Sequence, residues 1–190
     1  FSKIIGTPHT YPGVHNNTNE TITKSYKILK SNLNSKIAIE FASEYLIDNS
    51  LIKKARENSL LCIKDNFVLV EMSFISAPIN LYNIIFNLKT NNYIPILAHP
   101  ERYRFLSNNI SEYSKLKKFG CFFQINLLST TGYYGPDIVK NSEKLLKNNM
   151  VDFVGSDIHN MKHIFHFNDK IKVSQIKALE KCMINNRLFK

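Results

Sequence analysis

The sequence predicts an α/β fold in which parallel strands alternate with helices and close into a barrel. Short apolar runs alternate with longer amphipathic stretches, which is typical of strands joined by helical crossovers. The predicted strands are nearly all apolar, as expected when helices cover both faces of a sheet. An open sheet gathers polar residues mainly at one switch point, whereas a barrel gathers them from many strand ends, so the barrel is favoured. The strand ends carry His9, Glu44, Glu71, His99, Asn126, and Asp157 with His159.

Six runs are predicted to be strands because each is short and apolar and ends at polar residues. They are Lys3–Thr7, Lys36–Ala42, Phe67–Met72, Ile94–Ala98, Cys121–Asn126 and Phe153–Ser156. The first run begins at Lys3, directly after the start of the chain at Phe1, which is not an initiator methionine. We therefore expect a fragment or a processed chain.

Six amphipathic stretches between the strands are predicted to be helices. They are Glu20–Leu33, Leu51–Glu57, Pro78–Lys89, Ser111–Phe119, Asp137–Asn149 and Lys172–Ile184. Apolar residues recur with helical spacing at Ile79, Ile84, Ile85 and Leu88. Pro78 and Pro136 stand where the first turn of a helix tolerates proline.

The length and composition predict one globular domain. At 190 residues the chain is long enough for one sizeable core but short for two, so a single domain over residues 1–190 is expected. No apolar run approaches the ~18 residues that span a bilayer, and no cleavable signal stands at the start, so membrane insertion is not expected. Cys62, Cys121 and Cys182 are widely spaced and form no C-x-x-C pair, which predicts reduced thiols in a cytoplasmic protein.

The net charge of +10 comes from lysines scattered along the whole chain. A basic surface favours anionic substrates, including phosphorylated ones. Asparagine and isoleucine are also abundant, so A/T-rich codons explain much of this composition without a selected partner. We therefore do not expect nucleic acid as a partner.

Imidazole and carboxylate side chains at the strand ends make a candidate metal site. The set consists of His9, Glu44, His99, Asp157 and His159. Imidazole and carboxylate without thiolate favour Mn, Fe or Zn in a hydrolytic site. For any single histidine, a hydrogen-bonding role without metal is an equal alternative, but several strand ends supplying such residues favour the metal. The other histidines, His15, His163 and His166, lie in polar loops and are expected at the surface.

Two further glutamates compete with Glu44 for the ligand role. Glu40 lies inside an apolar run, where it would face a helix or the barrel interior. Glu71 follows Val68-Leu-Val at a strand end, where it would support a ligand or form an ion pair. The residues alone leave this choice open.

Two arginines follow His99 closely. A guanidinium beside a metal site suits the oxygens of a phosphate, which makes Arg102 the candidate phosphate-binding residue. The alternative is a structural ion pair with Glu101 or Glu112, and this alternative is favoured for Arg104.

Four segments of the chain resemble the PHP superfamily (polymerase and histidinol phosphatase). They are Thr7-Pro-His9 with Gly13, Ala42-Ser-Glu-Tyr45, Ala98-His-Pro-Glu-Arg-Tyr103 and Gly155-Ser-Asp-Ile-His-Asn160. The last two are quite specific together, and the four cover almost the whole chain. The closer resemblance is to the bacterial branch of manganese-dependent tyrosine-protein phosphatases encoded with capsule and exopolysaccharide genes.

The resemblance implies a distorted β/α barrel with a centre of two or three divalent ions, manganese first and iron or zinc as alternatives. Its ligands would be His9, Glu44, His99, Asp157 and His159. Glu44 would bridge two ions, and Arg102 would hold the phosphate during catalysis. The implied activity is hydrolysis of protein phosphotyrosine, with a bacterial tyrosine autokinase as partner. Phenolate, from a phenol with a pKa near ~10, leaves more readily than a serine alkoxide.

The chain departs from the family pattern at two places. The family opens with a strand that carries an H-x-H pair, and this segment would precede Phe1. We therefore expect an N-terminally truncated PHP-like domain without the first strand and helix of the barrel. Many relatives also carry an arginine shortly after the SD-x-H motif, where this chain has Lys162, His163 and Ile164. Lys162 is the expected substitute in substrate binding.

Three other functions remain open at this point. A histidinol-phosphate-type small-molecule phosphatase would use the same metals with a narrower pocket. The absent H-x-H segment is the reason to consider an inactive binding module or truncated remnant. The positive charge alone suggests an exonuclease-like role, which ranks last. The sequence leaves both a monomer and an oligomer open.

Overall fold

The computed structural model describes residues 3–34 and 36–190, which divide into two compact units. The first unit contains the described residues up to Ser73, Pro78–Ile96 and the last two residues of the chain, and the second contains Phe74–Ala77 and Leu97–Leu188. Parallel strands alternate with helices along the chain, which confirms the predicted α/β class. The single domain over residues 1–190 stays a prediction.

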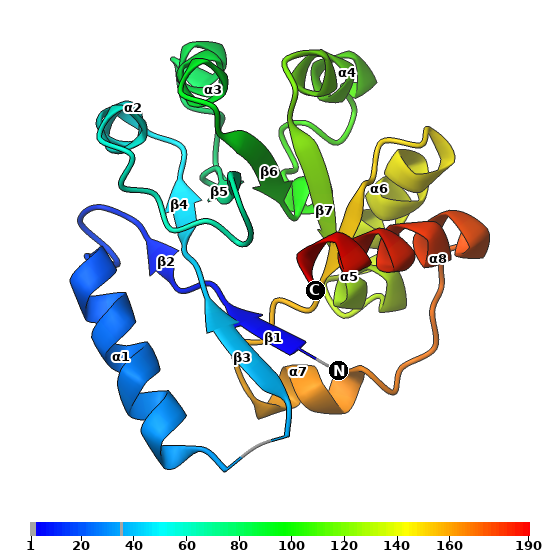
Figure 1. The fold of residues 1–190 in the computed structure, drawn as a ribbon. Coiled ribbons are helices and arrows are strands. Elements are labelled where there is room, and N and C mark those ends of the chain that lie inside the picture. Colours follow the sequence, from blue (N-terminus) through cyan, green and yellow to red (C-terminus); the bar gives the residue numbers. More distant parts are fainter. Residues whose placement is uncertain (1–2, 35) are drawn as a thin grey trace. The chain divides into compact units, whose positions relative to one another are not determined.

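The first unit holds two groups of parallel strands (Figure 1). They comprise β1 (Lys3–Gly6), β2 (His9–Thr10), β3 (Ala38–Phe41), β4 (Glu44–Leu46), β5 (Phe67–Glu71) and the first residues of β6 (Ile94–Ala98). β1 pairs with β3 in a separate two-stranded sheet, whereas β2, β4 and β5 lie side by side in that order. β2 and β4 were not predicted, because their residues, His-Thr and Glu-Tyr-Leu, do not form an apolar run.

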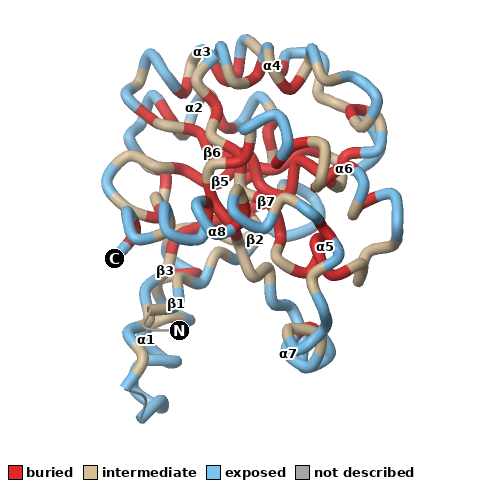
Figure 2. Tube along the Cα trace, turned by 90° about the vertical axis from the view of Figure 1, so that its right-hand side faces the viewer, coloured by how far each residue is buried: buried red, intermediate tan, exposed pale blue. Residues whose placement is uncertain are grey.

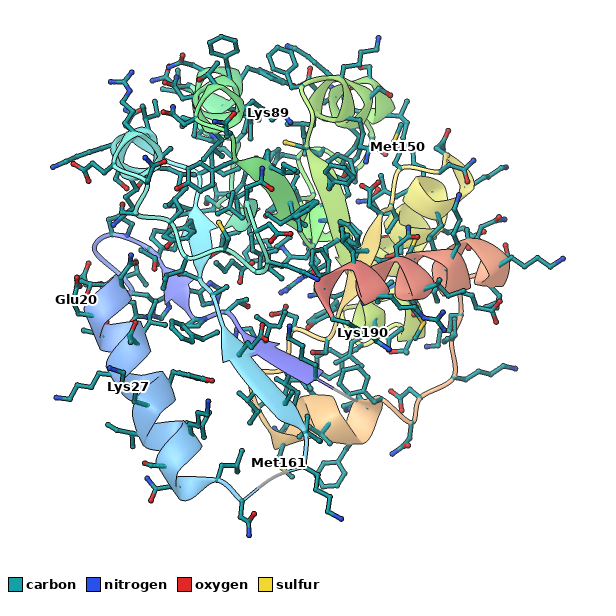
Figure 3. The ribbon with its side chains drawn as sticks, in the orientation of Figure 1. Glu20, Lys27, Lys89, Met150, Met161 and Lys190 are labelled. Atoms are coloured by element: carbon teal, nitrogen blue, oxygen red, sulfur yellow. The ribbon has the colours of Figure 1, made fainter. Side chains whose placement is uncertain are left out.

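Three predicted helices are found in the first unit, and their bounds are α1 (Asn19–Asn32), α2 (Asn49–Arg56) and α3 (Leu81–Thr90). α1 begins at a capping box, in which the side chains of Thr18 and Thr21 each accept a hydrogen bond from the other's backbone N–H. Within the described range 3–34, Ile22 is the buried residue of α1, and Figure 2 shows most of this helix as exposed. Glu20 and Lys27 point outward from it in Figure 3.

The second unit contains the end of β6, two further strands and most of the remaining helices. They are η1 (Pro100–Arg102), α4 (Ile110–Lys118), β7 (Phe122–Asn126), α5 (Leu127–Thr131), α6 (Pro136–Lys147), β8 (Phe153–Gly155), α7 (Met161–His166) and α8 (Ile176–Asn185). η2 (Asn186–Phe189) closes the chain. β7 and β8 pair in parallel, with Asn126 opposite Gly155. α5 and α7 were not predicted, since five or six residues show no helical period.

Each unit has an apolar core around its central strands, whereas β1 and β3 of the first unit are partly exposed (Figure 2). In the first unit Val68 and Val70 of β5 are fully buried, as is Leu88 of α3. In the second, Phe123 and Ile125 of β7 are fully buried. Each such side chain contributes about 1.5–3 kcal/mol by leaving water, so the cores hold the strand ends firmly in place. Within the described part of the chain, no helix has both the length and the apolar character needed to cross a membrane.

Candidate metal and phosphate sites

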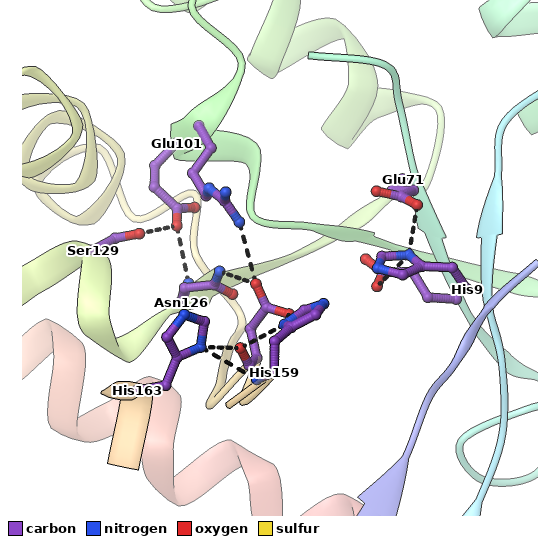
Figure 4. A network of polar contacts seen from close by, with 10 residues as sticks. His9, Glu71, Glu101, Asn126, Ser129, His159 and His163 are labelled. Atoms are coloured by element: carbon purple, nitrogen blue, oxygen red, sulfur yellow. Dashed lines mark hydrogen bonds and ion pairs between the residues drawn. The ribbon is translucent and has the colours of Figure 1, made fainter. Parts of the chain in front are cut away.

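An imidazole and two carboxylates meet in the first unit, on β2, β4 and β5. His9 opens β2 and stands opposite Glu44, the first residue of β4, while Glu71 ends β5 opposite Leu46. His9 Nδ1 lies 2.8 Å from Oε1 of Glu71 and 3.4 Å from Oε2 of Glu44 (Figure 4). One ligand atom from each of the three residues falls within 4.8 Å of the others.

The three side chains fit a divalent metal ion. The side chains of Glu44 and Glu71 are only 5% and 7% exposed, so both have lost most of their hydration. Two buried carboxylates this close repel each other, and a single imidazole offsets at most one of their charges. A divalent cation offsets both, and a donor set of nitrogen and oxygen without sulfur suits Mn, Fe or Zn. Glu71, whose role the sequence left open, thus joins the two predicted ligands.

Short hydrogen bonds fix the backbone that carries His9. The Ser43 hydroxyl donates to the carbonyl of Pro8 at 2.9 Å, and the Asn17 amide donates to the carbonyl of His9 at 2.8 Å. The ring of His15, in the loop that follows β2, stacks on that of His9 with centroids 5.4 Å apart. These contacts hold the imidazole beside the two carboxylates.

In the second unit, two predicted metal ligands sit in left-handed backbone conformations directly after strands. His99 follows β6 with φ 37°, and Asp157 lies two residues after β8 with φ 48°. This region costs a non-glycine residue about 1–2 kcal/mol, and such strain gathers at functional sites. His99 is buried, and its backbone N–H donates to the carbonyl of Gln124 on β7 at 2.7 Å.

Asp157 is the centre of a polar network in this unit, in which Asn126 and His159 are labelled in Figure 4. Its Oδ2 accepts hydrogen bonds from Nη1 of Arg102 at 3.2 Å and from Nδ2 of Asn126 at 2.6 Å. Its Oδ1 lies 3.3 Å from Nδ1 of His159, whose side chain is half exposed. The structure therefore brings together three residues predicted from the sequence and adds Asn126, which the sequence marked only as a polar strand end.

The guanidinium of Arg102 lies between two aromatic rings. Its central carbon is 4.7 Å from the ring centroid of Phe74 and 4.2 Å from that of Tyr134. Burial raises the pKa of the Tyr134 hydroxyl to about 12, so this side chain stays protonated and neutral at physiological pH. Cation–π attraction to two rings restricts the plane of the guanidinium, which prepares it for bidentate contact with an oxyanion.

Glu101 anchors the segment that carries Arg102. Its Oε1 accepts from the backbone N–H of Asn126 at 3.0 Å and from the hydroxyl of Ser129 at 2.5 Å. The amide of Asn141 donates to its backbone carbonyl at 2.7 Å. Complete burial raises the pKa of the Glu101 carboxyl. From the sequence, Glu101 was an alternative ion-pair partner expected for Arg102. In the structure, Arg102 forms its ion pair with Asp157 instead.

His163 supports the turn that carries Asp157 and His159. Its Nδ1 lies 3.0 Å from the carbonyl oxygen of Asp157 and 3.2 Å from the backbone nitrogen of His159. The expectation of a surface histidine was wrong, because Asn160 caps α7 and turns the first residues of this helix inward at His163. The spacing of four residues from His159, with an N-cap asparagine between them, was the signal for this contact.

Lys162 lies on the exposed side of α7. Among the residues that the structure describes, none forms a hydrogen bond or an ion pair with it. Its role in substrate binding stays a prediction.

The comparison with known proteins identifies the family. The protein-family model described as capsular polysaccharide synthesis, CpsB/CapC, matches residues 1–181 of this chain. The chain belongs to the CpsB/CapC family. The tyrosine-protein phosphatase YwqE of Bacillus subtilis is 29% identical over 175 residues, which cover 90% of this chain and 69% of that protein. The putative tyrosine-protein phosphatase CapC of Staphylococcus aureus is 27% identical over 196 residues, which cover 97% of this chain and 76% of that protein.

Solved structures of this family share the fold. A chain from the crystal structures of YwqE from Bacillus subtilis and CpsB from Streptococcus pneumoniae, described as unique metal-dependent tyrosine phosphatases, matches with a TM-score of 0.75 and 26% identity. The match covers 97% of this chain and 81% of that one. It confirms the fold class and the family that the sequence motifs predicted.

Proposed function

We propose that this CpsB/CapC family member is a metal-dependent phosphatase that removes phosphate from protein phosphotyrosine and thereby regulates capsular polysaccharide synthesis. The observation that carries the proposal is the guanidinium of Arg102, held between two rings and paired with Asp157. A phosphoryl group carries the same kind of oxygen pair as the carboxylate that Arg102 now contacts. The names of the relatives support a tyrosine phosphatase in particular.

The proposal assigns divalent metal ions to both sets of ligand residues. His9, Glu44 and Glu71, whose ligand atoms lie within 4.8 Å of one another, would hold metal in the first unit. In the second unit the proposed ligands are Asp157 and His159, which are in contact, together with His99. Manganese is the proposed metal, with iron or zinc as alternatives, because the donors are nitrogen and oxygen. A bound divalent ion supplies activated water and positive charge for phosphoryl transfer.

The chain's own residues would bind and orient the substrate. Arg102 would hold the phosphoryl oxygens, and Asn126 and Glu101 would keep the surrounding segments in register. Lys162, three residues after His159, is proposed as a second cation for the phosphate. The leaving phenolate needs little help from a general acid.

A bacterial tyrosine autokinase is the proposed partner. A phosphatase of protein phosphotyrosine needs a kinase that makes its substrate, and the family description places this protein in capsular polysaccharide synthesis. The autophosphorylated tyrosines of such a kinase would be the substrate.

The proposal is tested by phosphate release from a phosphotyrosine peptide and from histidinol phosphate, each with and without added Mn²⁺. We expect Mn²⁺-dependent turnover of the peptide. Arg102→Ala should lower kcat/KM by about 10²- to 10³-fold while metal content is unchanged, because it removes a charged group that stabilises the transition state. His99→Ala should lose both metal and turnover.

Arg104→Ala is the matched control, since Arg104 is an exposed arginine two residues away. It should retain full activity. Turnover of histidinol phosphate without turnover of the peptide would assign the protein to small-molecule chemistry instead. Absence of Mn²⁺-dependent turnover of either substrate would reject the phosphatase proposal for this chain.

A further inference from the structure

Phe74 is a half-exposed aromatic residue beside the phosphate-binding arginine of the second unit. Its exposed fraction is 46%, although its ring contacts three residues of the site. The ring stacks on His99 with centroids 5.3 Å apart and lies 5.7 Å from the ring of Tyr103. The guanidinium carbon of Arg102 is 4.7 Å from its centroid. Phe74 therefore lies at the rim of the site and keeps part of its surface open to a ligand.

The two rings beside Arg102 differ in a way that separates their roles. Tyr134 is more enclosed, and burial raises the pKa of its hydroxyl to about 12, as expected of a ring that supports the guanidinium from within. Phe74 has no polar side-chain atom to satisfy, and leaving nearly half of a phenylalanine residue in water is unfavourable by the hydrophobic effect. Such exposure next to a charged binding group is typical of a recognition surface rather than of a core residue.

The chemistry of an aryl phosphate places its ring within reach of Phe74. The phenyl ring of phosphotyrosine is attached to the phosphate through one oxygen atom, so a phosphate held by Arg102 brings the ring into the same neighbourhood. Aromatic pairs are favourable at centroid separations of about 4.5–7 Å, the range over which Phe74 already meets His99 and Tyr103. An alkyl phosphate has no ring to offer and gains nothing from this contact.

We propose that Phe74 is a specificity-determining residue that recognises the aryl ring of the substrate, so that the second unit prefers aryl over alkyl phosphates. This inference deepens the proposed function and rests on the assignment of Arg102 as the phosphate-binding residue. In this proposal Arg102 binds the phosphate, and Phe74 contacts the aryl ring to which the phosphate is attached.

The test compares the binding of benzylphosphonate and methylphosphonate by titration calorimetry in the presence of Mn²⁺. Neither probe is hydrolysed, so the measurement does not depend on turnover. The protein should bind benzylphosphonate more tightly, and Phe74→Leu should reduce this preference by about two- to ten-fold, the value of one aromatic pair. Phe74→Tyr, which keeps the aromatic ring, should retain the preference for benzylphosphonate. Phe86→Leu, at a similarly exposed phenylalanine on α3 of the first unit, is the control and should bind like the parent.

The outcomes separate a recognition role from a supporting one. If Phe74→Leu weakens both phosphonates equally, Phe74 merely positions Arg102 and the inference is rejected. Equal affinity of the parent for the two phosphonates would also reject it, even if phosphotyrosine is hydrolysed. A preference for benzylphosphonate that Phe74→Leu abolishes, in a chain that hydrolyses no phosphotyrosine, would sustain the recognition role and reject the proposed activity.

Discussion

Gly155 is the residue at which β8 comes close to the side chain of Gln124 on β7. A Cβ added at Gly155 would lie 2.5 Å from Nε2 and 2.9 Å from Cδ of Gln124. Gly155→Ala should therefore lower the free energy of unfolding by about 1 kcal/mol, the lower end of the cost of overpacking, because the Gln124 side chain must shift. Urea denaturation measures this change.

The double variant decides whether the clash is the cause. In the background of Gln124→Ala, the same Gly155→Ala substitution should cost little, because the obstructing amide is gone. Equal costs in the two backgrounds would show that Gly155 is required for another reason.

Residue types and their spacing were sufficient to predict part of the candidate site. His9, Glu44, His99, Asp157 and His159 are marked by short apolar runs that stop at ligand-type residues. The sequence does not show which atoms face each other. The contact between His9 and Glu71 joins residues 62 positions apart, and the pairing of Arg102 with Asp157 spans 55 positions. Such partners become visible only once strand order and register are known.

At the scale of elements, the end of α6 depends on a left-handed residue. Asn149 has φ 53° and its backbone N–H donates to the carbonyl of Leu146 at 3.0 Å. Asn149→Ala should lower the free energy of unfolding by about 1 kcal/mol, because alanine adopts this conformation less readily than asparagine. Asn149→Gly should leave stability unchanged or raise it slightly, since glycine adopts positive φ without strain.

Asn148 provides the matched control for this prediction. It is the neighbouring exposed asparagine, but its φ is −89°, which alanine adopts freely. Thermal unfolding of Asn148→Ala should differ little from that of the parent. A loss in Asn148→Ala as large as in Asn149→Ala would mean that side-chain hydrogen bonds, rather than backbone conformation, end the helix.

Length and apolar character together decided which elements the sequence could predict. The six runs predicted as strands and the six predicted as helices are all found, with bounds shifted by a few residues, because each shows an apolar run or an amphipathic period. The elements that were missed, such as β2, β4 and α7, have two to six residues. They are fixed by tertiary contacts, as when Asn160 caps α7 and His163 is drawn into the core.

At the scale of the whole molecule, both units carry a buried or half-buried thiol with an unusual proton affinity. Burial raises the pKa of Cys62 in the first unit, and that of Cys182 in the second, from 9.0 to about 11. The folded state thus holds these protons more tightly than the unfolded chain does. Their contribution to stability is fully present below pH 9 and is lost as the pH rises through about 11.

The free energy of unfolding should therefore fall between pH 9 and pH 11 in urea denaturation. Lysines and tyrosines titrate in the same range, so the decisive quantity is the difference between the parent and a variant with Cys62→Ala and Cys182→Ala. That difference should be constant from pH 6 to pH 8, because both thiols are protonated there in either state. Above pH 9 the variant should lose stability less steeply than the parent, since alanine has no proton to lose. Parallel curves up to pH 11 would mean that both thiols ionise in the folded protein as they do in the unfolded chain.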